Sequence, residues 1–261
     1  MLRSAKELEG YGVRATDDEV GSVRDFYFDD DRWAIRYLIV DTGAFFSGRR
    51  VLVSPIAFRE ADWSMRQFHL AMTREKVKNG PSIDLDKPVS RQHERDYFRY
   101  FGWPYYWGSD DAGIWGGEAY PAMLANHVWS NAEVPADEKG DPHLRSMREV
   151  IGYHIQGTDG DIGHIDDFIV DDQTWAIRYL VINTHNWWLD KKVLVAPHWA
   201  ERISWAENNI YIDLARQVIK NSPEWKSEAP VERPYELLLY NHYGRPGYWF
   251  GPDGKHAPKA G

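Results

Sequence analysis

The chain has 261 residues, a formal net charge of −9 and no cysteine. The absence of thiols excludes disulfides, cysteine catalysis and thiolate metal sites. The negative charge argues against nucleic-acid binding, which depends on cations that neutralise phosphates. No apolar run is long enough to span a membrane and no apolar secretory segment follows Met1, so we expect a cytoplasmic protein.

One hexapeptide occurs twice: Trp33–Leu38 and Trp175–Leu180 both read Trp-Ala-Ile-Arg-Tyr-Leu. The offset of 142 aligns Leu2–Asp111 with Leu144–Asp253 without a gap, and 38 of these 110 positions are identical. Self-similarity of this kind indicates two copies of one domain. We therefore predict domains at 1–111 and 144–253, a Gly-, Pro- and charge-rich connector at 112–143 and a frayed C-terminus at 254–261.

Each copy is predicted to open with one helical turn. Ser4 and Ser146 stand three residues before a glutamate, which is the spacing of a capping box. Gly10 and Gly152 then fit the left-handed position at which such a turn ends.

About five short strands follow in each copy. Short turns connect them, and an acidic hairpin turn (Asp29–Asp31, then Asp171-Asp172) precedes the repeated hexapeptide. Such a set, mostly antiparallel, predicts a mainly β fold of two tandem small barrels with five or six strands each. The predicted strands are Tyr11–Ala15, Val20–Phe28, Trp33–Val40, Val51–Val53 and Gln67–Met72, and Tyr153–Gly157, Ile162–Val170, Trp175–Ile182, Val193–Val195 and Asn209–Leu214.

A short helix and an aromatic tail are predicted to end each copy. Thr73 can cap a helix at Arg74–Lys78, and Asp213 can cap one at Leu214–Lys220. The tails cover residues 97–107 and 239–249.

The order of these motifs resembles the PRC-barrel family. The residues that carry the resemblance are Trp-x-Ile-Arg-Tyr-Leu, an aromatic loop with basic residues, Val-Leu-Val-x-Pro and a Thr-Arg-Glu-x-Val helix. That family includes the cytoplasmic barrel of the photosynthetic reaction-centre H subunit and the barrel of a bacterial ribosome maturation factor. The resemblance implies a bent, six-stranded barrel used for binding or assembly. The H subunit has a membrane helix that is missing here, so the only support for an H-subunit-like role is the family resemblance. In overall form the chain resembles tandem PRC-barrel proteins.

The loop after the third strand carries two aromatic residues and then two cations in both copies. Aromatic clusters beside charge are typical of protein interfaces, so one interpretation is a docking loop. The alternative is that the rings cap their own barrel or pack under the tail of the other copy, since burial stabilises each ring by about 1.5–3 kcal/mol. The residues are Phe45, Phe46, Arg49 and Arg50, and Trp187, Trp188, Lys191 and Lys192.

The tails share a Gly-x-Pro-x-Tyr-Trp spacing that ends at Tyr106-Trp107 and Tyr248-Trp249. These rings are either a ligand-binding aromatic platform or a cover for barrel edges that holds the two copies together. The second interpretation is favoured.

Arg36 and Arg178 lie inside an apolar strand, where a charge needs a partner. We predict structural ion pairs, with Asp25/Asp167 and Glu94/Glu236 as candidate acids. The acidic turns lack the spacing of a calcium loop and are expected to be solvated. Four histidines (His154, His164, His185 and His198) have no counterpart in the first copy, so a metal site in the second copy stays a minority alternative.

No catalytic motif is present. We predict no enzyme activity, cofactor or metal, and a tandem assembly or adaptor module that binds a protein partner or self-associates, its repeats packed with pseudo-two-fold symmetry. The alternative is a regulatory protein that binds a small molecule or metal through a pocket between the copies or through the second-copy histidines.

Overall fold

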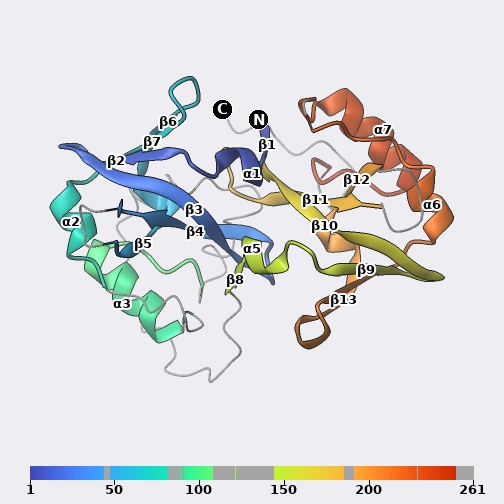
Figure 1. Ribbon diagram of the computed structural model, residues 1–261, viewed down its shortest axis with the longest axis horizontal. Helices are drawn as coiled ribbons and strands as arrows, with labels where there is room; N and C mark the ends of the chain where they lie inside the picture. Colours follow the sequence, from blue (N-terminus) through green and yellow to red (C-terminus); the bar gives the residue numbers. More distant parts are fainter. Residues whose placement is uncertain are drawn as a thin grey trace. The chain divides into compact units, whose positions relative to one another are not determined.

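The computed structural model describes residues 1–43, 48–81, 89, 91–107, 121, 144–184, 191–227 and 229–250. It is mainly β, with two seven-stranded sheets and a few short helices (Figure 1). The predicted fold class of two tandem β units is confirmed. No helix in the described ranges is long and apolar enough to cross a membrane.

The first sheet has the strand order β5-β4-β3-β2-β7-β6, and β8 pairs with β3. The pairing of β2 with β7 is parallel and the others are antiparallel. Its strands are β2 (Gly12–Arg14), β3 (Glu19–Asp29), β4 (Ala34–Asp41), β5 (Arg50–Val53), β6 (Phe58–Asp62), β7 (Gln67–Leu70) and β8 (Leu144–Ser146).

The second sheet repeats this order as β12-β11-β10-β9-β14-β13, and β1 pairs with β10. Here the parallel pair is β9 with β14. Its strands are β1 (Leu2–Ser4), β9 (His154–Gly157), β10 (Gly160–Asp171), β11 (Ile177–Asn183), β12 (Lys192–Val195), β13 (Ala200–Ser204) and β14 (Asn209–Ile212).

Six strands of each sheet therefore come from one repeat and the seventh from the other. The sixth strand, which the sequence left open, is β6 in the first repeat and β13 in the second. Both are polar edge strands, Phe-Arg-Glu-Ala-Asp and Ala-Glu-Arg-Ile-Ser, without the apolar alternation that identifies a half-buried strand.

Each compact unit of the chain combines segments of both repeats. One unit contains Ser4–Val150 and Val170–Arg178, and the other contains Met1–Arg3, Ile151–Ile169 and Tyr179–Gly261. We call them the Ser4–Val150 unit and the Tyr179–Gly261 unit.

The Ser4–Val150 unit is completed by two pieces of the second repeat. In β8, Ser146 donates a hydrogen bond to the buried carboxylate of Asp25 (2.5 Å), and Arg145 pairs with Asp30 (2.9 Å). The Trp175 indole lies 5.4 Å from the Phe58 ring and 5.8 Å from the Phe68 ring, measured between centroids.

The two copies of the repeated hexapeptide pair with each other in this unit. The amide of Ile35 donates to the carbonyl of Trp175 (2.8 Å), and the amide of Ile177 donates to the carbonyl of Trp33 (2.7 Å). Both tryptophans have a positive φ, 52° and 59°, which is uncommon for a bulky residue. The same local backbone geometry is thus used twice in a reciprocal contact.

The predicted caps are found at three of the four expected helix starts. Ser4 and Ser146 accept from the amides of Glu7 and Glu149 at the start of α1 (Ala5–Leu8) and α5 (Met147–Val150), and Thr73 caps α2 (Arg74–Lys78). The prediction for Asp213 was wrong, because α6 (Arg216–Lys220) begins after Ala215. The amide of Arg216, the first residue of α6, instead donates to the carboxylate of Asp159 (2.7 Å). The amide of Arg74 at the start of α2 donates to the carboxylate of Asp17 in the same way (2.7 Å).

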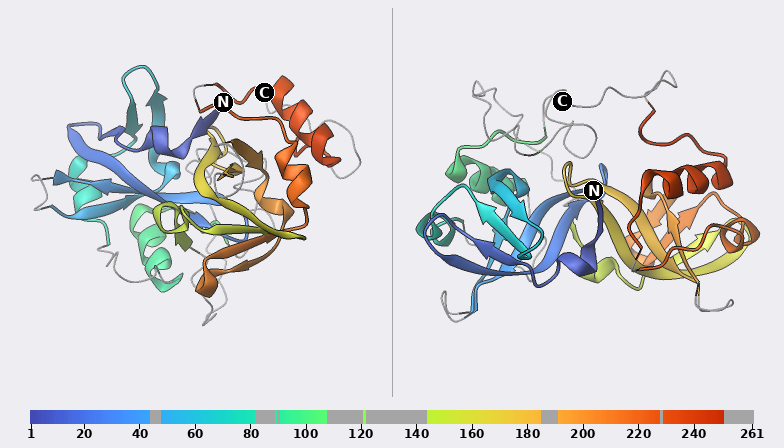
Figure 2. Two further views of the ribbon diagram at one scale, coloured as in Figure 1. Left: turned by 45° about the vertical axis from the view of Figure 1, so that its right-hand side comes forward. Right: turned by 90° about the horizontal axis from the view of Figure 1, so that it is seen from above.

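The first residues of each predicted tail belong to a helix that the sequence analysis did not predict. The two helices are α3 (Arg91–Phe101) and α7 (Arg233–Tyr243), each of 11 residues. Each lies against the strands of one unit (Figure 2). Apart from Pro121, the predicted connector lies outside the described residues, as does the predicted frayed end.

Candidate functional site

Helix α3 packs on β4 and β5 through one apolar face with a single acid in it. Its buried positions are Glu94, Tyr97, Phe98 and Phe101, which share one side of a helix. The Tyr97 hydroxyl donates to the carbonyl of Leu52 (3.0 Å). Glu94 is therefore carried into the core at the junction of α3, β4 and the tail.

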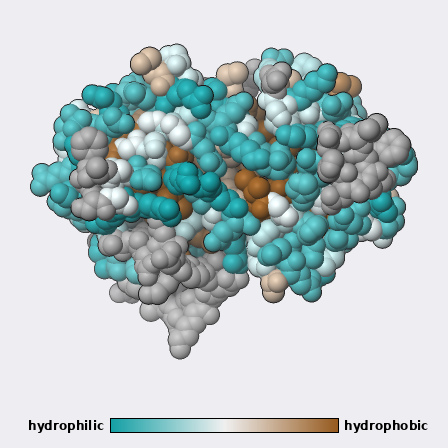
Figure 3. All heavy atoms as spheres, viewed as in Figure 1, coloured by the Kyte–Doolittle hydropathy of each residue, from teal (hydrophilic) through white to brown (hydrophobic). Residues whose placement is uncertain are grey.

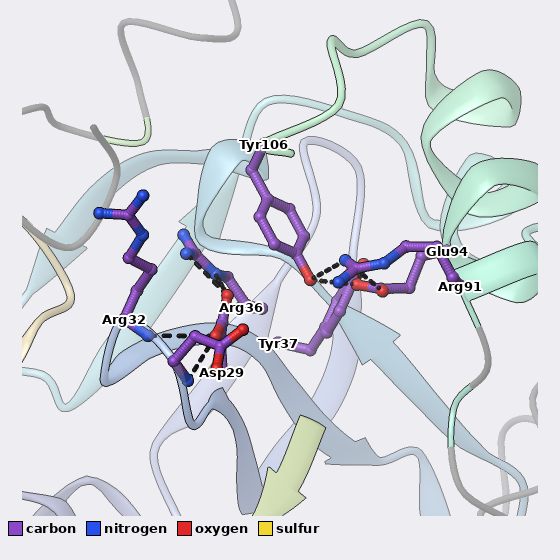
Figure 4. Close-up of polar contacts among 8 residues, drawn as sticks. Asp29, Arg32, Arg36, Tyr37, Arg91, Glu94 and Tyr106 are labelled. Atoms are coloured by element: carbon purple, nitrogen blue, oxygen red, sulfur yellow. Dashed lines mark hydrogen bonds and ion pairs between the residues drawn. The ribbon is translucent and has the colours of Figure 1, made fainter. Parts of the chain in front are cut away.

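A buried polar cluster surrounds this carboxylate (Figure 4). Its Oε1 accepts hydrogen bonds from the hydroxyls of Tyr37 on β4 (2.9 Å) and Tyr106 in the tail (2.5 Å). Its Oε2 pairs with Nη1 of Arg91 (2.9 Å), which also donates to the Tyr106 hydroxyl (3.0 Å). We call Tyr37, Arg91, Glu94 and Tyr106 the Glu94 clamp, because it joins strand, helix and tail.

Arg36 extends the clamp to the acidic hairpin turn. Its Nη2 pairs with Asp29 (3.0 Å), and its guanidinium carbon lies 4.1 Å from the centroid of the Tyr106 ring. Asp29 also accepts from the amides of Asp31 and Arg32. The Asp29 carboxylate is buried, and the Asp30 side chain is 8% exposed and paired with Arg145, so the expectation that this turn is solvated was wrong for its first two residues. Asp29 was not among the acids proposed as partners of Arg36.

Burial raises the pKa of Glu94, and the nearby Arg91 and the two tyrosine hydroxyls oppose this effect. Burial likewise raises the pKa of Tyr37 and Tyr106, and the neighbouring Glu94 charge adds to the increase. Both hydroxyls therefore stay protonated and act as donors. Three donors on one carboxylate offset the cost of removing its charge from water.

The second repeat has a similar cluster of Tyr179, Arg233 and Glu236 in the Tyr179–Gly261 unit, here called the Glu236 clamp. Glu236 accepts from the hydroxyl of Tyr179 (2.6 Å) and pairs with Arg233 (3.0 Å). Arg178 pairs with Asp171 (3.0 Å), as Arg36 does with Asp29. Burial acts to raise the pKa of Asp171, but Arg178 and backbone amides outweigh it, so the pKa is lowered.

Each clamp fixes an arginine over the tryptophan that ends the tail. The guanidinium carbon of Arg91 lies 4.5 Å from the ring centroid of Trp107, and that of Arg233 lies 3.9 Å from Trp249. The arginine side chains stay 29% and 46% exposed. Of the predicted tail residues, Tyr106 is buried, while Trp107, Tyr248 and Trp249 are partly buried.

The predicted loop residues are described only in part, because Phe45, Phe46, Trp187 and Trp188 lie outside the described residues. The first cation of each pair binds the end of a helix: Arg49 donates to the carbonyl of Gly80 (3.3 Å) and Lys191 to that of the equivalent Ser222 (2.5 Å). Of the second cations, Arg50 is exposed on β5, and Lys192 pairs with Asp166 (2.9 Å).

The three second-copy histidines that the structure describes are not gathered into one cluster. His154 and His164 are cross-strand neighbours on β9 and β10, His198 lies in the turn that follows β12, and His185 is outside the described residues. Among described residues no group of three or more metal-ligating side chains is present.

Tyr37/Tyr179 and Arg91/Arg233 are the clamp residues that sequence reasoning missed. All are identical at the 142 offset, as are Glu94 and Glu236. A signal existed: an arginine and a glutamate three residues apart, repeated before both tails, predict a helical ion pair.

Comparison with known proteins supports the resemblance for part of the chain. Residues 2–63 match the family of the PRC-barrel domain, which confirms the resemblance over that range. The chain is also similar to an uncharacterised protein of Deinococcus radiodurans, with 34% identity over 82 residues. That match covers 31% of this chain and 28% of the relative.

Proposed function

We propose that this chain is a non-catalytic assembly module that binds a protein partner through its aromatic tails. The observation that carries the proposal is the pair of clamps, each of which holds a half-exposed arginine over a tryptophan. Tryptophan, tyrosine and arginine are the side chains that contribute most to protein–protein binding. Fixing them in advance reduces the entropy lost on association.

The PRC-barrel match over residues 2–63 agrees with this proposal, because the resemblance implies a binding or assembly role. The clamps themselves are buried structural contacts, so their part is to position the rings.

The test is quantitative co-purification of the tagged full chain from its native cells. We expect at least one protein to be enriched by the wild type and to be lost in the double variant Trp107→Ala/Trp249→Ala. The control is Met65→Ala, which removes an exposed apolar side chain (64% exposed) from the turn between β6 and β7. The proposal is contradicted if no protein is enriched by the wild type, or if the double variant enriches the same protein equally well.

A further inference from the structure

The tail of the first repeat carries a continuous row of aromatic rings. Phe98 is fully buried, and the ring centroids of Trp103, Tyr105 and Trp107 lie 6.2, 6.2 and 5.5 Å from its own. Phe101 stacks on Trp103 (4.7 Å) and contacts Tyr100 (4.8 Å). The outer rings are those of Tyr100, Trp103, Tyr105 and Trp107, here called the tail ring row. Tyr100 is 39% exposed, and the other three are partly buried.

The second repeat forms the same helix without most of these rings, and its tail packs differently. The residues equivalent to Tyr100, Trp103 and Tyr105 are His242, Arg245 and Gly247. A Cβ atom at Gly247 would overlap the indole of Trp249, so that tail folds closely over its own backbone where the first repeat has a tyrosine side chain. The helix therefore forms in the second repeat without the extra rings.

Positive charge borders the tail ring row. Helices α2 and α3 together contain six Lys and Arg and three Asp and Glu, a local net charge of +3 in a chain of −9. Arg99 is 72% exposed and only loosely paired with Asp96 at 3.7 Å, and the exposed Lys76 lies 6.0 Å from the Phe101 ring. Where the structure describes it, the face shown in Figure 3 is largely hydrophilic, with a few separate hydrophobic areas.

We infer that the tail ring row with Lys76, Arg91 and Arg99 is the docking surface of the first repeat, and that it binds an acidic segment of a partner protein. The inference rests on the proposed function and makes it specific to one repeat. Exposed rings would bury the apolar side chains of the segment, and the three cations would pair with its carboxylates.

The charge pattern favours a protein segment over nucleic acid. Nucleic-acid binding needs many cations to neutralise successive phosphates. Here the cations are few, Asp96 lies among them on α3, and the whole chain is negative.

The experiment is site-specific photo-crosslinking in native lysate with the full chain. The photoreactive residue p-benzoylphenylalanine replaces Tyr100, and in a matched probe it replaces the equivalent His242. We expect the Tyr100 probe to yield a crosslinked peptide with more Asp and Glu than Lys and Arg, and the His242 probe to yield none. The yield should fall as NaCl is raised from about 0.05 to about 0.5 M.

Two variants of the Tyr100 probe test the surface itself. Trp103→Arg/Tyr105→Gly installs the residues of the second repeat, and Arg99→Glu reverses one exposed charge without touching the core. Each should lower the crosslinking yield about tenfold. Unchanged yields, a neutral or basic peptide, or a nuclease-sensitive adduct would overturn the inference.

The two proposals fail separately. If partner enrichment depends on Trp107 and Trp249 but the Tyr100 probe does not crosslink, the proposed function is supported and the docking surface inferred here is wrong. Absence of enrichment and of crosslinking removes both.

Discussion

At the residue scale, Glu94 is a charge in a site that excludes water, so its neighbours decide whether it stabilises the fold. Two tyrosine hydroxyls and one arginine contact it. A buried charge costs more when a partner is lost than it contributes when all partners are present. The clamp is therefore sensitive to small changes.

Replacement of Tyr106 by phenylalanine tests this sensitivity. The ring remains, but Glu94 and Arg91 each lose a partner. We expect the free energy of unfolding to fall by about 1–3 kcal/mol, measured by denaturant unfolding of the full chain. The partly exposed neighbour provides the control: Tyr105→Phe should change it by less than about 0.5 kcal/mol. Equal effects would show that the hydroxyl of Tyr106 is not needed.

The pH dependence of stability tests the burial of Glu94. Burial raises its pKa above the ordinary value of 4.5. Such a carboxyl stabilises the folded state below the unfolded pKa and loses that contribution as the pH rises through the folded pKa. The unfolding free energy of the wild type minus that of Glu94→Gln should therefore decrease as the pH rises above the ordinary pKa of 4.5. The exposed Glu75→Gln serves as control, and a difference that rises with pH would contradict this account.

At the element scale, strands β3 and β4 approach each other closely where Gly21 faces Asp41. A Cβ atom at Gly21 would overlap the carbonyl of Asp41, and one at Gly163 would overlap that of Asn183 in the second repeat. The equivalent glycines thus permit the same close approach in both sheets.

Gly21→Ala should consequently destabilise the protein by about 1–3 kcal/mol, because backbone atoms have to move. At Gly12 the nearest atom belongs to the flexible side chain of Gln67, 3.3 Å from the added Cβ, so Gly12→Ala should cost less. Thermal unfolding of the two variants compares them directly. A smaller loss at Gly21 than at Gly12 would count against the close approach.

Elements with a strong apolar pattern could be predicted from the sequence, and the others could not. The buried run in β4 and the capped start of α2 were found because burial and capping leave direct signals. Edge strands β6 and β13 carry no such signal. Helix α3 did carry one, with buried positions at 94, 97, 98 and 101, but its aromatic content suggested an irregular tail.

At the scale of the whole molecule, the sequence predicted the repeat but not the exchange of strands between the two repeats. Strands β1 and β8 have the same sequence, Leu-Arg-Ser, and each joins the sheet of the other repeat. Identical strands fit either sheet equally well, so no pattern in the sequence could assign them. The Glu94 clamp was missed for a related reason, since Tyr37 and Glu94 are 57 residues apart.

The exchange gives a specific expectation for Trp175. This residue belongs to the second repeat, but its buried indole packs on Phe58 and Phe68 of the first. Trp175→Ala should destabilise the protein by about 3–5 kcal/mol. The partly exposed Trp33 of the same hexapeptide is the matched control, and Trp33→Ala should have a smaller effect.

The central claim, that each compact unit is built from both repeats, is tested most directly by hydrogen exchange of the full-length Trp175→Ala variant. We predict faster amide exchange in β6 and β7 of the first repeat, where the indole packs. Faster exchange confined to residues of the second repeat, with β6 and β7 unchanged, would contradict the claim.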